Sequence, residues 1–494
     1  MKMKGAQILI QSLIDQGTDT VFGYPGGAVL NIYDALYERK NEIRHILTSH
    51  EQGAAHAADG YARSSGKTGV VIATSGPGAT NLVTGIATAF LDSVPMVAIT
   101  GNVALDLIGR DSFQEIDIAG ITMPITKHNY IVKNVAELQD TVSEAFVIAN
   151  SGRCGPVLID IPKDITAQET EYVKKEKFLK RVTPEPDAAE IETAAAAINR
   201  SNRPMIYSGG GVVSSGATKE LLAFSKRINA PVAATIPGIS AVPYDYPLYL
   251  GMIGMHGTAA ANKAPQECDL LIAVGARFSD RVASDRRRFA TNAEILHIDI
   301  DPSEISKNVR CGLSVTGDAK RILSLLAEKT ERKTDGGWAH EMVRYKAQNA
   351  LPAAAPEGLS PRDIIREVRN CFGPDTIIVT DVGQHQMFTA QFYECSRPRT
   401  FITSAGLGTM GFGLGAAIGA KTANPDKPVV LITGDGSFHM NMNELATAVT
   451  ENIPLTILVM NNGVLGMVRQ WQKLFYGERY SGTTLSRKTD LVRL

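Results

Sequence analysis

Short apolar segments alternate with helical segments along the whole chain, and this alternation restricts the fold more than any other feature. Runs such as Val429–Ile432 and Leu455–Met460 are continuous apolar stretches of strand length, typical of parallel strands buried on both faces. A strand, a helix and a second strand in succession predict a βαβ unit. The pattern recurs in three blocks, so we expect an α/β fold with three doubly wound parallel sheets.

Two proline-containing segments separate the blocks. Val182–Asp187 carries two prolines and acidic residues, and Leu351–Pro356 begins and ends near proline, so neither suits a helix or a central strand. After Asn462 the third block offers one helix and a polar stretch, so we expect its domain to be incomplete at the C-terminus. The expected organisation is a first domain over 1–165, a linker over 166–188, a middle domain over 189–330, a linker over 331–360 and a third domain over 361–494.

The composition indicates an enzyme that acts on small molecules. The 494 residues are 44% hydrophobic and 20% charged, and a net charge of −1 provides no basic surface for nucleic acid or membranes. The five cysteines lack the paired spacing of a disulfide framework or a zinc site. The N-terminus leads directly into a helical pattern, and no apolar run approaches the ~20 residues of a membrane span. We therefore expect a cytoplasmic protein.

The segment from Gly434 to Asn462 predicts a metal-bound diphosphate site. Asp435 follows one apolar strand and Asn462 follows the next, so parallel pairing would bring their side chains to the same sheet edge. A carboxylate and an amide oxygen suit Mg²⁺, which completes its octahedron with phosphate and water oxygens. The helix that begins after Gly436 adds backbone N–H groups facing the anion. A Gly-Asp-Gly sequence by itself is more often a simple turn than a metal site. The presence of Asp435 and Asn462 at the ends of two successive strands is what favours a metal site here.

The first block carries a second group of candidate residues. Glu51 stands at the start of an alanine-rich helix, where a glutamate otherwise merely compensates the helix dipole. Glycine-rich turns at Phe22–Ala28 and Thr74–Asn81 lie at strand ends and allow the backbone to approach a ligand closely. Each turn alone is weak evidence, and the combination indicates a binding edge.

Together these segments resemble the thiamine diphosphate (ThDP) enzymes, and the whole chain is similar to the acetohydroxyacid (acetolactate) synthase large subunit family. The resemblance implies a pyrimidine domain, a central FAD-binding domain and a diphosphate domain. It also implies decarboxylation of pyruvate and transfer of the remaining two-carbon unit to a second 2-oxo acid. The products would be 2-acetolactate or 2-aceto-2-hydroxybutanoate, the first common step of branched-chain amino acid biosynthesis.

The resemblance assigns most of the ThDP and Mg²⁺ ligands. Glu51 would hydrogen-bond the aminopyrimidine ring and favour the tautomer that removes the thiazolium C2 proton. Met410 would wedge beneath the bent cofactor, whereas an unassigned methionine would be core filling. The metal ligands would be Asp435, Asn462 and the main-chain carbonyl of Val464. The implied ThDP-binding set is Glu51, Pro77, Asn81, Gln384, His385, Gly408, Met410, Gly434, Asp435, Gly436, Ser437, Asn462, Gly466 and Met467.

The substrate residues are likewise implied by the family. Backbone around Gly27 would stabilise developing oxygen charge, and Trp471 would shape the pocket for the second 2-oxo acid. Two lysines would line a cationic approach, although each could equally be a solvated surface charge. The implied substrate and catalytic set is Glu51, Gly27, Phe113, Gln114, Lys127, Lys163, Met410, Trp471 and Arg281.

The middle block predicts a flavin site whose role in the family is structural and not redox. A glycine turn after a strand is a weak signal alone, and the family pattern extends it. The chain departs from the usual pattern at Asn102, Cys154, Pro237 and Ser279. The implied FAD set is Arg153, Gly209, Gly210, Gly211, Thr235, Ile236, Met255, His256, Gly257, Thr258, Gly275, Arg277, Asp299, Ile300, Asp318 and Ala319.

Family sites combine the first domain of one subunit with the third domain of its partner, so the resemblance implies a homodimer or homotetramer. A small regulatory subunit is a further expected partner. Two alternatives stay open from the sequence. The first is a pyruvate oxidase-like ThDP and FAD enzyme, and the second is an inactive truncated subunit that acts only in assembly.

Overall fold

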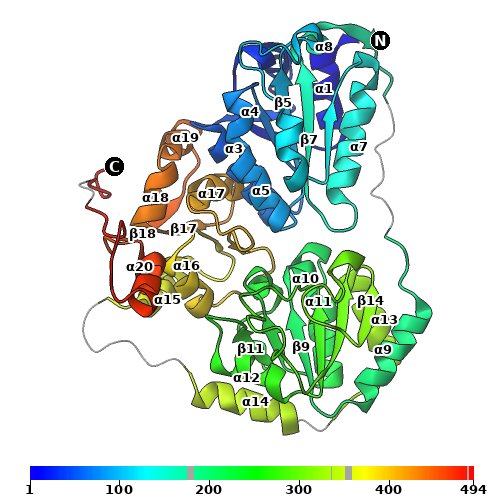
Figure 1. Cartoon of the computed structure of the whole chain (residues 1–494), viewed down its shortest axis with the longest axis vertical. Helices are drawn as coiled ribbons and strands as arrows, with labels where there is room; N and C mark the ends of the chain where they lie inside the picture. The colour runs from blue at the N-terminus through cyan, green and yellow to red at the C-terminus, as the bar shows by residue number, and fades with distance from the viewer. Residues whose placement is uncertain (175–182, 335–336, 351–358, 487–488) are drawn as a thin grey trace. The chain divides into compact units, whose positions relative to one another are not determined.

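The computed structural model describes residues 1–174, 183–334, 337–350, 359–486 and 489–494 (Figure 1). The expected linker segment Leu351–Pro356 and residue Val182 lie outside the described residues. The described residues divide into two compact units. One unit comprises the described residues of Met1–Val182, Ile377–Gln386 and Ile402–Leu494, and the other comprises those of Thr183–Thr376 and Met387–Phe401. The first block and most of the third block therefore share a unit, whereas residues 361–376 and 387–401 of the third block belong to the other unit.

The first block forms a six-stranded parallel sheet in the order β3-β2-β4-β5-β7-β6. Strands β4, β5 and β7 are buried along their whole length, as expected for central strands covered on both faces. The strands are β2 (Thr20–Tyr24), β3 (Arg44–Leu47), β4 (Gly69–Ala73), β5 (Met96–Asn102), β6 (His128–Ile131) and β7 (Pro156–Pro162). The helices are α1 (Gly5–Asp15), α2 (Leu30–Glu38), α3 (Glu51–Ser65), α4 (Pro77–Asn81), α5 (Val83–Leu91), α6 (Ile118–Thr122), α7 (Leu138–Asn150) and α8 (Lys163–Ala167).

The middle block forms a second six-stranded parallel sheet in the order β11-β10-β9-β12-β13-β14. Its strands are β9 (Pro204–Ser208), β10 (Val232–Ala234), β11 (Tyr249–Met252), β12 (Leu270–Val274), β13 (Glu294–Asp299) and β14 (Leu313–Thr316). The helices of this block are α9 (Ala188–Arg200), α10 (Gly210–Ser215), α11 (Thr218–Ile228), α12 (Ala259–Glu267), α13 (Ala319–Lys329) and α14 (Gly337–Gln348).

The third block forms a smaller sheet in the order β16-β15-β17-β18, in which β15, β17 and β18 are parallel neighbours. The strands are β15 (Ile377–Thr380), β16 (Phe401–Ile402), β17 (Val429–Gly434) and β18 (Thr456–Met460). Helices α15 (Pro361–Phe372), α16 (Gln384–Phe392), α17 (Phe412–Ala423), α18 (Asp435–Asn441), α19 (Glu444–Thr450) and α20 (Gly466–Phe475) accompany it. The prediction of three parallel α/β sheets is confirmed.

Both expected linkers contain secondary structure that the sequence reading missed. The short strand β8 (Glu169–Glu171) pairs antiparallel with β1 (Lys2–Lys4). Helix α14 falls inside the expected linker 331–360, and it buries Trp338, Ala339 and Met342 in the core of the middle block. The charged residues that precede α14 favour a linker in the sequence, so the apolar face of the helix is not evident from the sequence alone. The proposed domain limits themselves stay a prediction.

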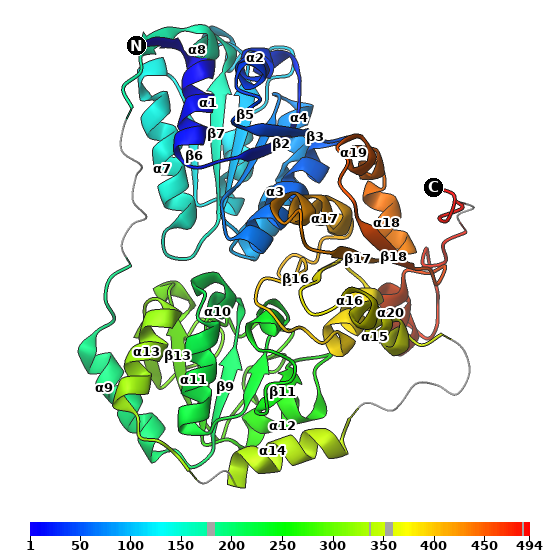
Figure 2. The same cartoon turned by 180° about the vertical axis from the view of Figure 1, so that it is seen from behind.

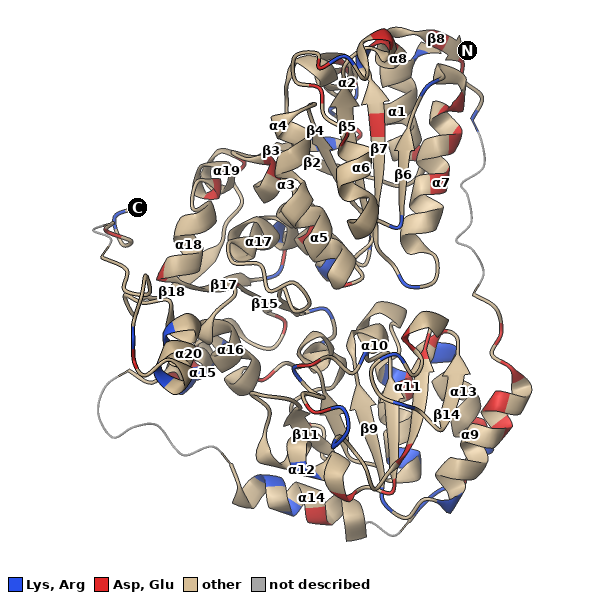
Figure 3. Ribbon diagram, in the orientation of Figure 1, with Lys and Arg blue, Asp and Glu red and all other residues tan. Residues whose placement is uncertain are grey.

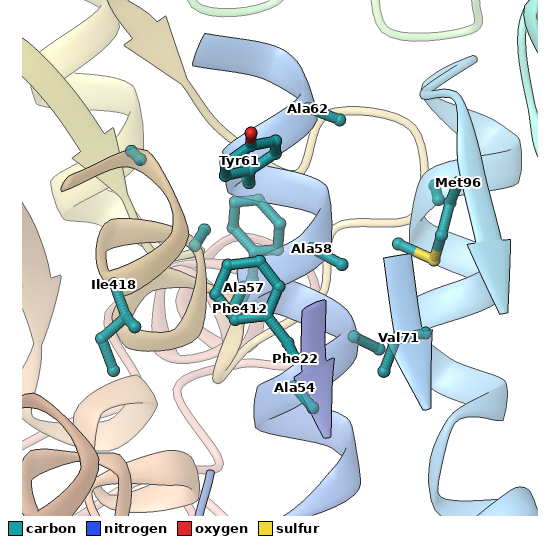
Figure 4. Packing of buried hydrophobic residues seen from close by; sticks show 14 of the residues in the cluster. Phe22, Ala54, Ala57, Ala58, Tyr61, Ala62, Val71, Met96, Phe412 and Ile418 are labelled. Atoms are coloured by element: carbon teal, nitrogen blue, oxygen red, sulfur yellow. The ribbon is translucent and has the colours of Figure 1, made fainter. Parts of the chain in front are cut away.

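Helices α3 and α17 carry the core that joins the first and third blocks (Figures 1 and 2). Small residues let the two backbones touch, because a methyl group on Gly419 would lie 1.8 Å from the carbonyl oxygen of Ala57. The large aromatic side chains buried around this contact include those of Phe22, Tyr61 and Phe412 (Figure 4). Burying such rings removes about 150–250 Å² each from water. The first and third blocks therefore share one hydrophobic cluster, and a second cluster lies within the first block alone.

Charges of both signs are spread over all three sheet domains (Figure 3), in keeping with the net charge of −1. Among the helices of the described residues, none is long and apolar enough to cross a membrane.

Candidate active site

Glu51 occupies the first position of α3, directly after the C-terminal end of β3. The helix begins here because the His50 ring caps it, with Nδ1 accepting the backbone N–H of Gln52 at 3.1 Å. Glu51 is only 9% exposed, and its Oε2 accepts a hydrogen bond from Asn81 Nδ2 at 2.9 Å. The predicted pair Glu51 and Asn81 is thus in direct contact.

The glycine turns predicted in the first block gather around this carboxylate. A methyl group on Gly78 would lie 3.2 Å from Glu51 Oε1, so only a hydrogen fits there with ease. Gly76, with φ of +59°, backs onto Gln114, whose Cα would be 3.0 Å from such a methyl group. The ends of β2 and β4 also meet, because the Ala28 N–H donates to Thr74 Oγ1 at 3.3 Å. Residues far apart in the sequence therefore form one edge.

The third block builds a second edge at the ends of β17 and β18. These strands pair in parallel with Gly434 opposite Met460, so Asp435 and the loop at Asn462 emerge together. Asp435 Oδ2 accepts the backbone N–H of Gly463 at 3.1 Å, and Asn462 Oδ1 accepts that of Val464, also at 3.1 Å. The expected parallel pairing of the two strands is present, and the role of Asp435 and Asn462 as metal ligands stays a prediction.

His385 and Gln384 line the same edge from the start of α16. A methyl group on Gly434 would lie 2.8 Å from His385 Nδ1, so the ring packs flush against the strand end. Burial lowers the pKa of His385 to about 4, which keeps the ring neutral. Gln384 contacts the other side of the edge, because its Oε1 would lie 2.1 Å from a methyl group on Gly466.

A buried carboxylate that no sequence motif identifies holds the Met410 loop in place. Asp381 follows β15 and accepts the backbone N–H groups of Gly411 at 2.9 Å and Gly413 at 3.1 Å. Its burial raises its pKa to about 6, against these hydrogen bonds. Met410 Cε would lie 3.8 Å from a methyl group on Gly436, so the predicted methionine reaches the diphosphate segment.

The predicted flavin residues of the middle block include two glycine turns in close contact. A methyl group on Gly209 would lie 2.0 Å from the carbonyl oxygen of Gly275, and one on Gly211 would lie 2.6 Å from Gly275 Cα. Thr235 and Asp318 cap short helical segments by accepting the backbone N–H groups of Gly238 and Arg321. The glycine turns follow β9 and β12, and Thr235 and Asp318 follow β10 and β14. The carboxyl ends of parallel strands are where α/β sheets bind phosphates.

The donor set at Asp435 fits magnesium better than a transition metal. Among the described residues, no group of three or more His, Cys, Asp or Glu side chains converges on a common point. A cation there would depend on one carboxylate, an amide, a main-chain carbonyl and oxygens from a ligand. Hard oxygen donors of this kind are typical of Mg²⁺ bound with a phosphate.

Comparison with known proteins identifies the family. Three domain models of thiamine pyrophosphate enzymes match, the N-terminal TPP-binding domain over 3–121, the central domain over 191–326 and the C-terminal TPP-binding domain over 381–494. A probable acetolactate synthase large subunit of Methanocaldococcus jannaschii is 49% identical over 100% of this chain and 86% of its own length. The acetolactate synthase isozyme 2 large subunit of Escherichia coli is 47% identical over 100% and 89%. The chain belongs to the acetolactate synthase family.

Membership in this family makes the chain a ThDP-dependent enzyme, and it explains the two edges. Glu51 lies within the matched N-terminal TPP-binding domain, and Asp435 lies within the C-terminal one. The acetolactate synthase large subunit of Corynebacterium glutamicum, 48% identical over 99% of this chain and 80% of its own length, adds a further relative.

Three residues implied by the family are exposed or hydrogen-bonded to other segments in the described structure. Lys127 Nζ donates to the carbonyl oxygens of Ile148 and Ser151 at the end of α7, which is a helix-capping role. Phe113 is 89% exposed, and Trp471 on α20 is 40% exposed with its ring against Phe475. Their substrate roles stay predictions.

Proposed function

We propose that this chain catalyses the acetolactate synthase reaction with ThDP, Mg²⁺ and a structural FAD. The observation that carries the proposal is the pair of edges at Glu51 and Asp435, each built at the carboxyl ends of parallel strands. Bound ThDP supplies a carbon nucleophile and an electron sink for the decarboxylation of pyruvate. The substrates are two 2-oxo acids, and the products are carbon dioxide and 2-acetolactate or 2-aceto-2-hydroxybutanoate.

Glu51 acts as the proton-transfer group at the pyrimidine ring. Its Oε2 is held by Asn81, so we assign the exchange of a proton with the ring nitrogen to Oε1. The carboxylate is nearly excluded from water, which strengthens its interaction with a bound ring. The hydrogen bond from Asn81 fixes its direction before any substrate arrives.

Asp435, Asn462 and the carbonyl oxygen of Val464 hold Mg²⁺, and the backbone of α18 faces the diphosphate. Support comes from the parallel pairing of β17 and β18, which delivers the ligands from one sheet edge. The neutral imidazole of His385 packs beside this edge, and we assign to it a hydrogen bond to a phosphate oxygen.

FAD occupies the middle block in this proposal, with its diphosphate over the turns of Gly209–Gly211 and Gly275. The turns are fixed in this contact by their own backbone, because the N–H groups of Gly209, Gly211 and Gly275 donate to the carbonyl oxygens of Val274, Gly275 and Ile298. The flavin has no redox role. The resemblance also implies Arg153 as a member of this set.

We further propose that the active protein is a homodimer or homotetramer in which one chain supplies Glu51 and its partner supplies Asp435. The relatives are named large subunits, which supports a small regulatory partner as well. Phe113 and Trp471 are exposed in the single chain, as expected of residues that meet substrate or a second chain.

Product identity tests the proposal. The purified chain is incubated with [2-¹³C]pyruvate, ThDP and Mg²⁺, and the product is followed by ¹³C NMR before and after acid converts acetolactate to acetoin. We expect 2-acetolactate and an oxidised flavin. Acetyl phosphate or acetate with flavin reduction would identify an oxidase, and cofactor binding without turnover would identify an assembly subunit.

A further inference from the structure

Glu444 is a fully buried carboxylate on α19 that faces the segment leading into Glu51. Its side chain has no exposed surface, although it belongs to the third block and its neighbours belong to the first. Helix α19 lies beside the first block in both views of the chain (Figures 1 and 2). A buried carboxylate must be matched by hydrogen bonds, so its partners reveal its role.

The carboxylate of Glu444 binds the backbone just before α3. Its Oε2 accepts the N–H of Ser49 at 3.1 Å, and the N–H of His50 also donates to this carboxylate. The same oxygen accepts from Thr447 Oγ1 at 2.7 Å, which fixes its position on α19. Ser49 is held a second time, because its hydroxyl donates to the carbonyl oxygen of Asn443 at 3.0 Å.

The other carboxylate oxygen packs against the first turn of α3. A methyl group on Gly53 would lie 2.2 Å from Glu444 Oε1, a distance at which one of the two groups must move. The glycine therefore makes room for the carboxylate, and Glu51 lies between the two contact points, at Ser49 and Gly53. Burial raises the pKa of Glu444, and the hydrogen bonds from Thr447, Ser49 and His50 oppose this rise.

We propose that Glu444 is a positioning residue that sets the orientation of Glu51 by clamping the turn from Ser49 to Gly53. It acts through the backbone and touches no cofactor atom. This inference rests on the proposed function, because it assumes that Glu51 exchanges a proton with ThDP. An error of about 1 Å in the position of a reacting group can reduce a rate by about 100-fold.

Two variants disturb the clamp from opposite sides, and a third is the matched control. Glu444→Gln replaces one acceptor oxygen by an N–H group that opposes the donors of Ser49 and His50. Gly53→Ala adds a methyl group where Oε1 lies. Glu451→Gln breaks the pair between Arg44 Nη2 and Glu451 Oε2 at 3.3 Å, a contact between the same two blocks that does not involve the Glu51 turn.

The first measurement uses the chain without cofactor. Amide hydrogen exchange, followed by mass spectrometry, reports the protection of the 49–54 backbone, where the clamp acts. We expect Glu444→Gln and Gly53→Ala to exchange faster in this segment than the wild type, and we expect Glu451→Gln to match the wild type. Unchanged protection in both clamp variants would overturn the proposal.

The second measurement uses the chain saturated with ThDP and Mg²⁺, without pyruvate. The rate of C2 hydrogen–deuterium exchange is read by NMR after an acid quench, and the ThDP dissociation constant by calorimetry. We expect the two clamp variants to slow C2 exchange about 10- to 100-fold with an unchanged dissociation constant. Slowing of equal size in Glu451→Gln would overturn the proposal. Since no substrate is present, failure to form acetolactate would reject the proposed function and leave this result standing.

Discussion

At the scale of single residues, the proposed metal site depends on one carboxylate. Asp435→Asn removes the ligand charge and leaves the side chain the same size, so we expect ThDP and Mg²⁺ to bind at least about 10-fold more weakly. Titration calorimetry with ThDP at fixed Mg²⁺ measures the change. Asp426→Asn, on an exposed turn before β17, is the control and should bind like the wild type. Equal binding by both variants would remove Asp435 from the site.

His56 gives a pH prediction because it is buried between α3 and Phe412, whose ring lies edge-on at 5.3 Å. Burial lowers its pKa from 6.5 to about 3, so the unfolded chain binds more protons than the folded one between these values. Stability from this group is therefore full above pH 6.5 and is lost as the pH falls. We expect the free energy of unfolding of the chain to fall by about 2 kcal/mol between pH 7 and pH 5 because of this histidine.

Thermal unfolding of wild type and His56→Gln at pH 7 and pH 5 checks this prediction. The wild type should lose more stability than the variant over that range, whereas the exposed His340→Gln should follow the wild type. Parallel losses in wild type and His56→Gln would contradict it.

Residues differ in how far the sequence predicts them. Asp435 and Asn462 were predictable because each directly follows an apolar strand, and parallel pairing alone brings them together. Glu444 and Asp381 were not, since their partners at Ser49 and Gly411 lie in other segments and only the folded chain defines them. The local sequence pattern therefore predicts candidate ligands at strand ends. The residues that support those ligands can be identified only from tertiary contacts.

At the scale of elements, the contact of α3 and α17 limits substitution more than helix propensity does. Gly419→Ala should improve propensity by about 1 kcal/mol, yet its methyl group would meet the carbonyl oxygen of Ala57. We expect a net loss of about 1–3 kcal/mol, because backbone cannot move aside as a flexible side chain does. Denaturant unfolding measures it, with Thr450→Ala at the exposed end of α19 as the propensity control. A stabilised Gly419→Ala would show that the helices have room.

The elements were also predicted unevenly. The strands of all three sheets follow from their apolar runs, and the parallel order follows from the alternation with helices. Helix α14 was missed because a charged, proline-bordered segment was interpreted as a linker, although Trp338 and Met342 stand one helical turn apart. Burial against the middle sheet stabilises it, and that contact is not local.

At the scale of the whole molecule, mixing inactive chains tests whether a site combines two subunits. Glu51→Gln should lower kcat by about 100- to 10,000-fold, and Asp435→Asn should lower cofactor binding. If each site takes Glu51 from one chain and Asp435 from its partner, every mixed dimer contains one intact site and one doubly altered site. After denaturation and refolding of an equal mixture, we expect about a quarter of the wild-type activity. No recovery would place both halves in one chain.

The ratio of carbon dioxide released to pyruvate consumed tests the central claim most directly. The purified chain is supplied with ThDP, Mg²⁺, FAD and pyruvate as the only 2-oxo acid, and both quantities are measured in the same reaction. Condensation of the two-carbon unit with a second pyruvate predicts one carbon dioxide for every two pyruvates, with 2-acetolactate as the product. A ratio of one to one, with acetyl phosphate or acetate formed and the flavin reduced, would contradict the assignment.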